Sequence, residues 1–200
     1  MTIMKKTPSF KPLLTALALS LGLMAGTHAA EINGVKIEDS VKVAGKDLTL
    51  NGAGTRIKAV FKVYVVGLYL TDKKTTTADV LALGGPKRFK IVMMRDLTGE
   101  EFGSAFLAGI NKNLEKDEKS KFVNQLVKLG ETFETIPGLK KGDIVVGDWI
   151  PGTGTQITVN GKAVVDPLPD NQFYNAILRI WLGNSPADSA LKPMLLGETS

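Results

Sequence analysis

The alternation of apolar and polar residues in the first half of the chain predicts β-strands. The longest such segment, residues 57–70 (IKAVFKVYVVGLYL), alternates at its start. From Val63 onward it is apolar on both faces, as in a strand whose sheet is covered on each side. Its fourteen residues exceed the usual length of a strand, so we expect a bulge or bend, with Gly67 as a candidate position. Shorter strands are expected at residues 41–43, 48–50 and 88–94.

The second half of the chain combines helical spacing with further strand patterns. A capping box, Thr98 with Glu101 three residues later, opens a predicted helix. Further helices are expected over residues 117–135 and 170–181, with a short final one after Ser185-Pro186. Strands are expected at residues 143–150, 155–159 and 162–165, with an Asn-Gly hairpin turn at 160–161. This order of elements describes one α+β domain rich in antiparallel pairing.

The N-terminus has the three parts of a secretory signal peptide. Three lysines precede an uncharged apolar run over residues 13–26, and Thr27-His28-Ala29 offers small residues where a signal peptidase reads them. The run is shorter than the ~20 residues that a transmembrane helix needs. We therefore expect residues 1–29 to be a signal peptide and residues 30–200 to be a periplasmic or secreted domain. The alternative is an uncleaved N-terminal anchor. No later segment is apolar enough to span a membrane.

Removal of this leader changes what the charge implies. The chain has 25 Lys and Arg against 20 Asp and Glu, but three of the basic residues lie in the leader, which leaves 22 against 20. A net charge of +2 provides no polyanion-binding surface, so we expect no nucleic-acid partner. The chain has no cysteine, and its one histidine, His28, lies in the leader. The mature protein therefore has no Ser-His-Asp triad, Cys-His dyad or histidine-ligated zinc or haem, and we expect neither metal nor cofactor.

Five segments, taken in order, resemble the chalcone isomerase superfamily. They are residues 52–56 (GAGTR), 61–70 (FKVYVVGLYL), 97–102 (LTGEEF), 151–155 (PGTGT) and 181–186 (WLGNSP). The last two are similar to the bacterial chalcone isomerase-like branch, and the set covers essentially the whole mature chain. The resemblance implies an open-faced β-sandwich, in which a large antiparallel sheet has helices packed on one side.

The resemblance also implies a ligand site. Plant members of the family close a flavanone ring with an arginine, a threonine and a tyrosine around a bound water. Other members are non-catalytic and grip the carboxylate of a fatty acid with an arginine and a tyrosine. The arginine matches Arg56, the catalytic threonine falls on Tyr64, and the catalytic tyrosine falls on Phe102. Because Phe102 cannot donate a hydrogen bond or a proton, that role is empty unless Tyr64 or Tyr69 fills it.

Arg56 and Tyr64 are also candidates on physical grounds. Arg56 enters an apolar segment after the glycine-rich break at residues 51–54, and a buried guanidinium must be paired or face a ligand. The alternative is a turn arginine paired with a nearby acid or with carbonyl groups. Along one strand, Tyr64 would lie roughly 26 Å from Arg56, so the two share a site only if the chain folds between them. Otherwise Tyr64 fills the core, as we expect for Tyr69.

Arg95 is the third candidate for ligand contact. It follows an apolar strand end, from which it can point into a cleft between sheet and helix. The favoured alternative is a solvated cluster with the adjacent acids Asp96, Glu100 or Glu101. The large apolar residues are expected to form the core, where some of them can line a tunnel; they are Phe61, Phe89, Met93, Met94, Phe102, Phe106, Phe173 and Trp181.

These observations lead to three functional hypotheses. The first is an exported, non-catalytic domain that binds a fatty acid or a similar small amphipathic carboxylate, with Arg56 and Tyr64 at the head group and Arg95 nearby. Burial of a dozen methylenes would supply roughly 10 kcal/mol before the costs of binding, at ~0.8 kcal/mol each. The second is an intramolecular lyase or isomerase of the chalcone isomerase type, acting on a phenolic or enone substrate. The third is an envelope protein-interaction module without a ligand, which predicts a filled core and an apolar surface patch.

Overall fold

The computed structural model describes residues 29–198. The predicted signal peptide lies outside these residues except for Ala29, which begins the first strand. The strands are β1 (Ala29–Ile32), β2 (Val35–Glu38), β3 (Ser40–Val43), β4 (Lys46–Lys58), β5 (Phe61–Leu70), β6 (Lys87–Met93), β7 (Ile144–Ile150), β8 (Gly154–Val159) and β9 (Lys162–Ala163). The helices are α1 (Thr77–Ala82), α2 (Gly99–Asn111), α3 (Lys116–Lys121), α4 (Val123–Thr135), α5 (Asn171–Leu182) and α6 (Leu191–Leu195).

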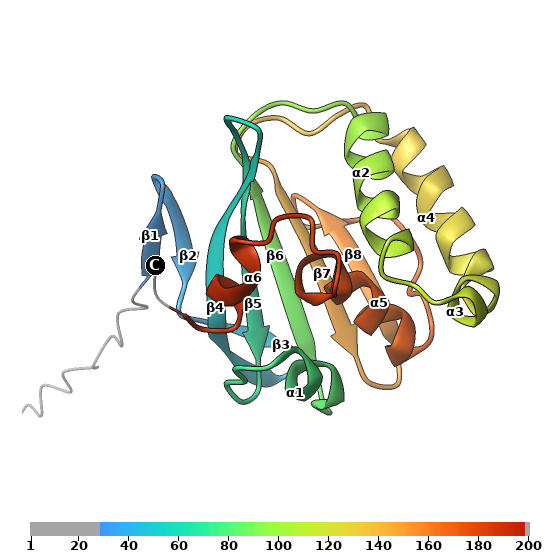
Figure 1. Cartoon of the computed structure of the whole chain (residues 1–200), viewed down its shortest axis with the longest axis horizontal. Helices are drawn as coiled ribbons and strands as arrows, with labels where there is room; N and C mark the ends of the chain where they lie inside the picture. The colour runs from blue at the N-terminus through green and yellow to red at the C-terminus, as the bar shows by residue number, and fades with distance from the viewer. Residues whose placement is uncertain (1–28, 199–200) are drawn as a thin grey trace, which may run out of the picture.

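Seven of the strands form one antiparallel sheet in chain order, β3 to β9 (Figure 1). Helices α2, α4 and α5 cover one face, where the main apolar cluster lies. A second, smaller cluster packs Ile37 of β2 against Val65 and Tyr69 on the opposite face of β5. The expected α+β architecture with helices on one side of an antiparallel sheet is confirmed, as is the burial of β5 on both faces.

Residues 57–70 do not form one strand. β4 ends at Lys58, the chain turns through Ala59-Val60, and β5 returns from Phe61. The expected irregularity is not at Gly67, because the register shifts instead between Arg56 and Ile57 and between Leu50 and Gly52. The single-strand prediction failed because Val60, an exposed β-branched residue, continues the strand pattern through the turn.

The glycine-rich segment 51–54 lies inside β4, where it gives another element room to approach. A Cβ atom on Gly52 would lie 2.0 Å from the Met194 carbonyl oxygen, so only glycine allows α6 to pack directly on this strand. The Asn51 side chain fixes the same contact by donating to the Leu195 carbonyl at 2.7 Å. Residues 51–54 therefore do not end the strand, as the sequence suggested, but allow α6 to pack on it.

Local signals in the second half predicted most elements correctly. Thr98 and Glu101 form the expected capping box of α2, and the turn at Asn160-Gly161 has the two positive φ angles, 49° and 78°, that such a hairpin requires. The predicted helix over 117–135 is instead two helices, because Phe122 leaves helical geometry between them and packs edge-on against Phe173. The last helix begins later than Pro186, at Leu191. Across residues 29–198, the longest apolar helices are too short to cross a membrane.

Candidate functional site

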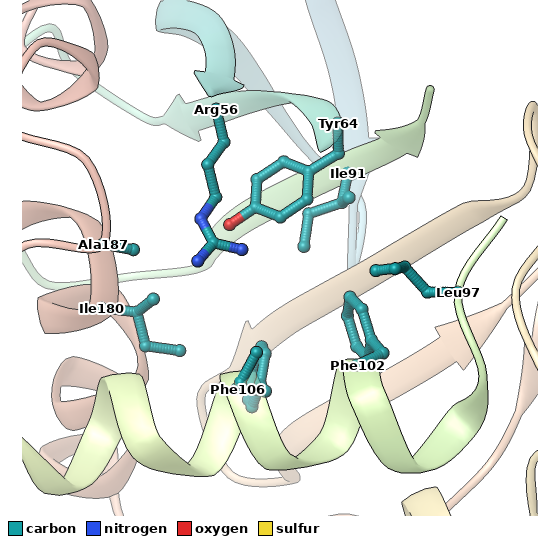
Figure 2. A pocket seen from close by; sticks show the side chains of 9 residues that line it. Arg56, Tyr64, Ile91, Leu97, Phe102, Phe106, Ile180 and Ala187 are labelled. Carbon is teal, nitrogen blue, oxygen red and sulfur yellow. The ribbon is translucent and has the colours of Figure 1, made fainter. Parts of the chain in front are cut away.

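The β4–β5 hairpin places Arg56 directly opposite Tyr64 on the helix-facing side of the sheet (Figure 2). The Arg56 guanidinium carbon lies 5.5 Å from the centre of the Tyr64 ring, within the range of a cation–π contact. The strand pairing shifts register directly after Arg56. Irregularities of this kind are common beside functional sites, where they redirect a side chain. The two candidates therefore share a site, and they do so because the chain folds between them.

The hydroxyl group of Tyr64 is held by helix α5. Trp181 Nε1–H donates to the Tyr64 oxygen at 2.9 Å, and both side chains are buried. In the part of the chain that the structure describes, no acceptor takes the proton of the Tyr64 hydroxyl, so this O–H remains free to donate. Burial raises the pKa of Tyr64, although the positive charge of Arg56 acts in the opposite direction. The group is therefore a neutral hydrogen-bond donor at neutral pH.

Arg56 is only partly satisfied by its surroundings. Its Nε atom is buried without a hydrogen-bond partner, and no carboxylate within residues 29–198 lies within ion-pair distance of the guanidinium. Asp188 is close to this strand but is occupied by backbone donors, accepting from Ile57 N at 2.9 Å and from Ala190 N at 3.0 Å. The expected alternative, a turn arginine paired with a nearby acid, is not what the structure shows.

Arg56 and Tyr64 face a small apolar cavity between the sheet and helices α2 and α5 (Figure 2). Only about 20 Å³ is available there to the centre of a water-sized sphere, enough for about one water molecule. Phe102 and Phe106 fill the floor, and their rings pack edge-on against Phe133. The other lining residues are Ile91, Leu97, Ala105, Ile180 and Ala187. The space between sheet and α2 is thus packed with aromatic rings and holds no acyl-sized tunnel at this point.

A larger, open cleft of about 580 Å³ begins at the same arginine. It shares Arg56, Leu97 and Ala105 with the inner cavity, so Arg56 lies at the junction of the two. Its volume is in the range of small-molecule sites. The remaining lining residues are Lys58, Ala59, Phe61, Val63, Arg95, Glu101 and Ser104.

Arg95 lies on the wall of this cleft and not in an acidic cluster. Its guanidinium carbon is 4.9 Å from the centre of the Phe61 ring, and it makes no ion pair within residues 29–198. Two of the adjacent acids accept hydrogen bonds from other groups: Asp96 accepts from Lys140 and Lys141, and Glu101 accepts from Thr98 N. Arg95 therefore forms no direct ion pair with the neighbouring acids, in contrast to the favoured alternative. The hydrogen bond with Thr98 lowers the pKa of Glu101, and the charge of Arg95 adds to this effect across the cleft. Phe61 is also not in the core, since 57% of its surface is exposed.

The lining of the site supports binding more readily than acid–base chemistry. In the inner cavity the only ionisable side chains are Arg56 and Tyr64, and burial raises the pKa of Tyr64 further from neutral pH. Phe102 lies on the cavity floor without a polar atom. Within the described residues, no group of histidines, cysteines or carboxylates is arranged to hold a metal ion. Sequence reasoning placed Trp181 in the core and missed that its N–H orients Tyr64.

Comparisons with known proteins agree with this architecture. The fold is similar to that of a fatty-acid binding protein from Arabidopsis thaliana, with a TM-score of 0.67 and 15% sequence identity; the match covers 84% of this chain and 96% of the plant protein. No curated protein sequence matches the chain. A family model described as chalcone isomerase-like matches residues 29–197. The chain therefore belongs to the chalcone isomerase-like family.

Proposed function

We propose that this protein binds a fatty acid or a similar small amphipathic carboxylate and does not transform it. The observation that carries the proposal is the pair of unsatisfied donors, Arg56 Nε–H and the Tyr64 hydroxyl, on one wall of the site. A buried donor without an acceptor costs free energy, and an anionic acceptor placed between the two would remove that cost. The fatty-acid binding protein with a similar fold supports the same ligand class.

A carboxylate suits these donors better than a neutral group does. It accepts hydrogen bonds only, it is ionised at neutral pH, and its two oxygens match the fork of a guanidinium. The ring of Tyr64 holds the Arg56 cation from one side, and the buried Nε–H of Arg56 still has no hydrogen-bond partner. This N–H group is then available to the head group.

The apolar part of the ligand would lie along the open cleft. The inner cavity is too small for an acyl chain, whereas the cleft is walled by Phe61, Val63 and Leu97. Each methylene that leaves water there contributes up to ~0.8 kcal/mol before the losses on binding. This placement differs from a tail between sheet and helices, which would require Phe102 and Phe106 to move.

The experiment begins with residues 30–200, purified and extracted with organic solvent for mass spectrometry of bound lipids. Titration with palmitate by calorimetry then compares three variants. Arg56→Ala is expected to weaken binding by about 30- to 100-fold and Tyr64→Phe by about tenfold, the usual sizes for charged and neutral hydrogen bonds. Lys42→Ala removes an exposed cation on β3 and is the matched control, with no expected change. Unchanged affinity in Arg56→Ala would overturn the proposed role of Arg56.

Two further measurements test the geometry and the chemistry. Ser104 is exposed on α2 and lines only the cleft, so Ser104→Trp should weaken palmitate binding if the tail lies there and leave it unchanged if the tail enters the core. Turnover of a chalcone that is lost in both Arg56→Ala and Tyr64→Phe would replace the binding role with the isomerase role.

Export to the periplasm is part of the proposal and rests on the pattern of the leader. Cleavage after Ala29 would remove only the first residue of β1 and leave its pairs from Ala30 to Ile32 intact. The intact mass of protein recovered from the periplasm of an expression host tests this. A mature chain that begins at Ala30 is expected, whereas a full-length chain in the membrane fraction would indicate an uncleaved anchor.

A further inference from the structure

The tip of the β4–β5 hairpin, residues 57–62, exposes an unusual concentration of apolar side chains. Of the five large hydrophobic residues that are strongly exposed in residues 29–198, three lie here: Ile57 at 47%, Val60 at 84% and Phe61 at 57% exposure. The tip lies at one end of the sheet, beside the connections from β6 to α2 and from α4 to β7 (Figure 1). It is therefore an exposed apolar turn at the end of the sheet.

Basic side chains surround this tip. Lys58 and Lys62 lie within it, Arg95 covers one face of the Phe61 ring, and residues 57–62 contain no acid. Asp188 and Glu101 approach it, and each accepts a backbone hydrogen bond, although Glu101 also faces the charges of Arg95 and Lys58 across the cleft. Asp188 accepts the Ile57 N–H at the base of the hairpin, and Glu101 caps α2 across the cleft.

The residues of this turn suit neither its backbone conformation nor its exposure to water. Ala59 has a φ of 55°, in the left-handed region that glycine favours, and Val60 next to it is almost fully exposed. Another tight turn of the sheet, at Asn160-Gly161, uses residues that suit both the backbone and water, and the turn at Ala44-Gly45 has glycine at its second position. An apolar turn of this kind is better suited to a position where the tip leaves water.

We propose that this hairpin tip docks on a lipid surface that carries anionic head groups. Apolar side chains that enter the interface, combined with lysine and arginine side chains at head-group level, are the two contributions that bind proteins peripherally to such membranes. A protein partner fits less well, because a stable interface buries about 800 Å² on each side and a hairpin tip with three apolar side chains offers no such area. A second copy of the chain would face the same basic collar and be repelled by it.

Docking at this tip would orient the cleft. Lys58, Ala59 and Phe61 belong both to the tip and to the lining of the cleft that starts at Arg56. A docked tip therefore places the mouth of the cleft at the lipid surface, where an amphipathic ligand can pass between bilayer and protein. This last step rests on the proposed ligand-binding function, whereas the docking itself does not.

The experiment measures co-sedimentation of residues 30–200 with vesicles of phosphatidylglycerol and phosphatidylcholine, and with vesicles of phosphatidylcholine alone. These residues contain all elements of the described fold except the first residue of β1, and they lack the apolar leader, which would bind vesicles by itself. Binding is expected to the anionic vesicles only and to weaken as salt is raised. Val60→Glu should weaken it at least about tenfold, and Lys58→Ala about fivefold, as expected for one cation near an anionic surface.

Val127→Glu is the matched control, since it makes the same substitution at an exposed valine of α4. It should bind vesicles like the wild type. Val60 does not line the cleft, so palmitate affinity in Val60→Glu should stay unchanged, which separates failure of docking from failure of ligand binding.

A positive signal from the tip comes from Phe61→Trp, whose added fluorescence should shift to the blue with anionic vesicles. The proposal would be overturned if the wild-type protein did not bind anionic vesicles, or if Val60→Glu and Val127→Glu reduced vesicle binding equally. A wild-type dimer that becomes monomeric in Val60→Glu, seen by sedimentation equilibrium, would assign the tip to a second copy instead.

Discussion

Two arginines of the same sheet, Arg88 and Arg56, differ in what lies across the strand from them. Arg88 on β6 is opposite Asp148 on β7, and its Nε and one terminal nitrogen each donate to a carboxylate oxygen at 2.6 Å. Arg56 on β4 is opposite Tyr64 on β5, which offers the face of an aromatic ring. Both residues lie in strands of the sheet, but the Arg88 guanidinium is paired with a carboxylate and the buried Nε–H of Arg56 has no partner.

This difference separates a structural ion pair from the arginine that we propose as a binding group. The two-pronged pair raises the pKa of Arg88 through its hydrogen bonds with Asp148 and leaves little capacity for a ligand. The face of an aromatic ring stabilises a cation electrostatically, but it does not accept the hydrogen bonds that a guanidinium donates in its own plane. Tyr64 thus keeps Arg56 in place while its donors stay available.

The largest expected effect that tests this comparison is on stability. Arg88→Met should lower the free energy of unfolding by about 3 kcal/mol, because it leaves the carboxylate of Asp148, whose side chain is only 13% exposed, without its partner. Arg56→Met should change it by less than about 1 kcal/mol, because no acceptor loses a donor. Urea unfolding of the two variants and the wild type measures both values. Equal costs at the two positions would mean that Arg56 is also a structural residue.

A third cation, Lys87, sharpens the comparison because it pairs with no acid among residues 29–198 and lines neither the cavity nor the cleft at Arg56. Its side chain is fully buried and donates to Asn175 Oδ1 at 3.0 Å, and its contacts with the Val80 and Leu81 carbonyls are longer, at 3.4 Å. Burial lowers the pKa of Lys87 from 10.5 to about 8. Between these two values the unfolded chain binds a proton that the folded chain does not, so this lysine's contribution to stability rises with pH across that window and is lowest below about pH 8.

Lys87→Met should therefore be more stable than the wild type at neutral pH, by up to about 3 kcal/mol. The advantage should shrink steadily as the pH rises towards 10.5. Urea unfolding at several pH values measures the difference between the two proteins, which cancels the titration of the tyrosines. A difference that does not change with pH would show that Lys87 titrates normally in the folded state.

Local signals in the sequence explain which parts of the fold could be predicted. The capping box at Thr98 and the Asn160-Gly161 turn depend on residues close in sequence, and both form as expected. The importance of Arg56 followed from the cost of burying an unpaired guanidinium, which is independent of topology. The fold class followed from the order of strands and helices.

The parts that could not be predicted depend on contacts between distant residues. The acids beside Arg95 are adjacent in sequence, but Asp96 is taken by Lys140 and Lys141, more than forty positions away. The size of the inner cavity depends on how Phe106 of α2 meets Phe133 of α4. The β4–β5 turn was missed because Ala59 and Val60 are not turn-forming residues, although this turn brings Arg56 opposite Tyr64.

The smallest prediction concerns this turn, since it creates the contact on which the comparison of the two arginines depends. Ala59→Gly should raise the free energy of unfolding by about 0.5 to 1 kcal/mol, because glycine relieves the positive φ of 55° by more than it adds flexibility to the unfolded chain. Gly161→Ala, at a φ of 78° with no atom near the added methyl group, should lower it by a similar amount. Urea unfolding compares the two. If Ala59→Gly instead destabilises the protein, the backbone at Ala59 is held by contacts of the alanine methyl group, and the turn is not strained. Palmitate affinity should then fall as well, because the register that places Tyr64 against Arg56 would loosen.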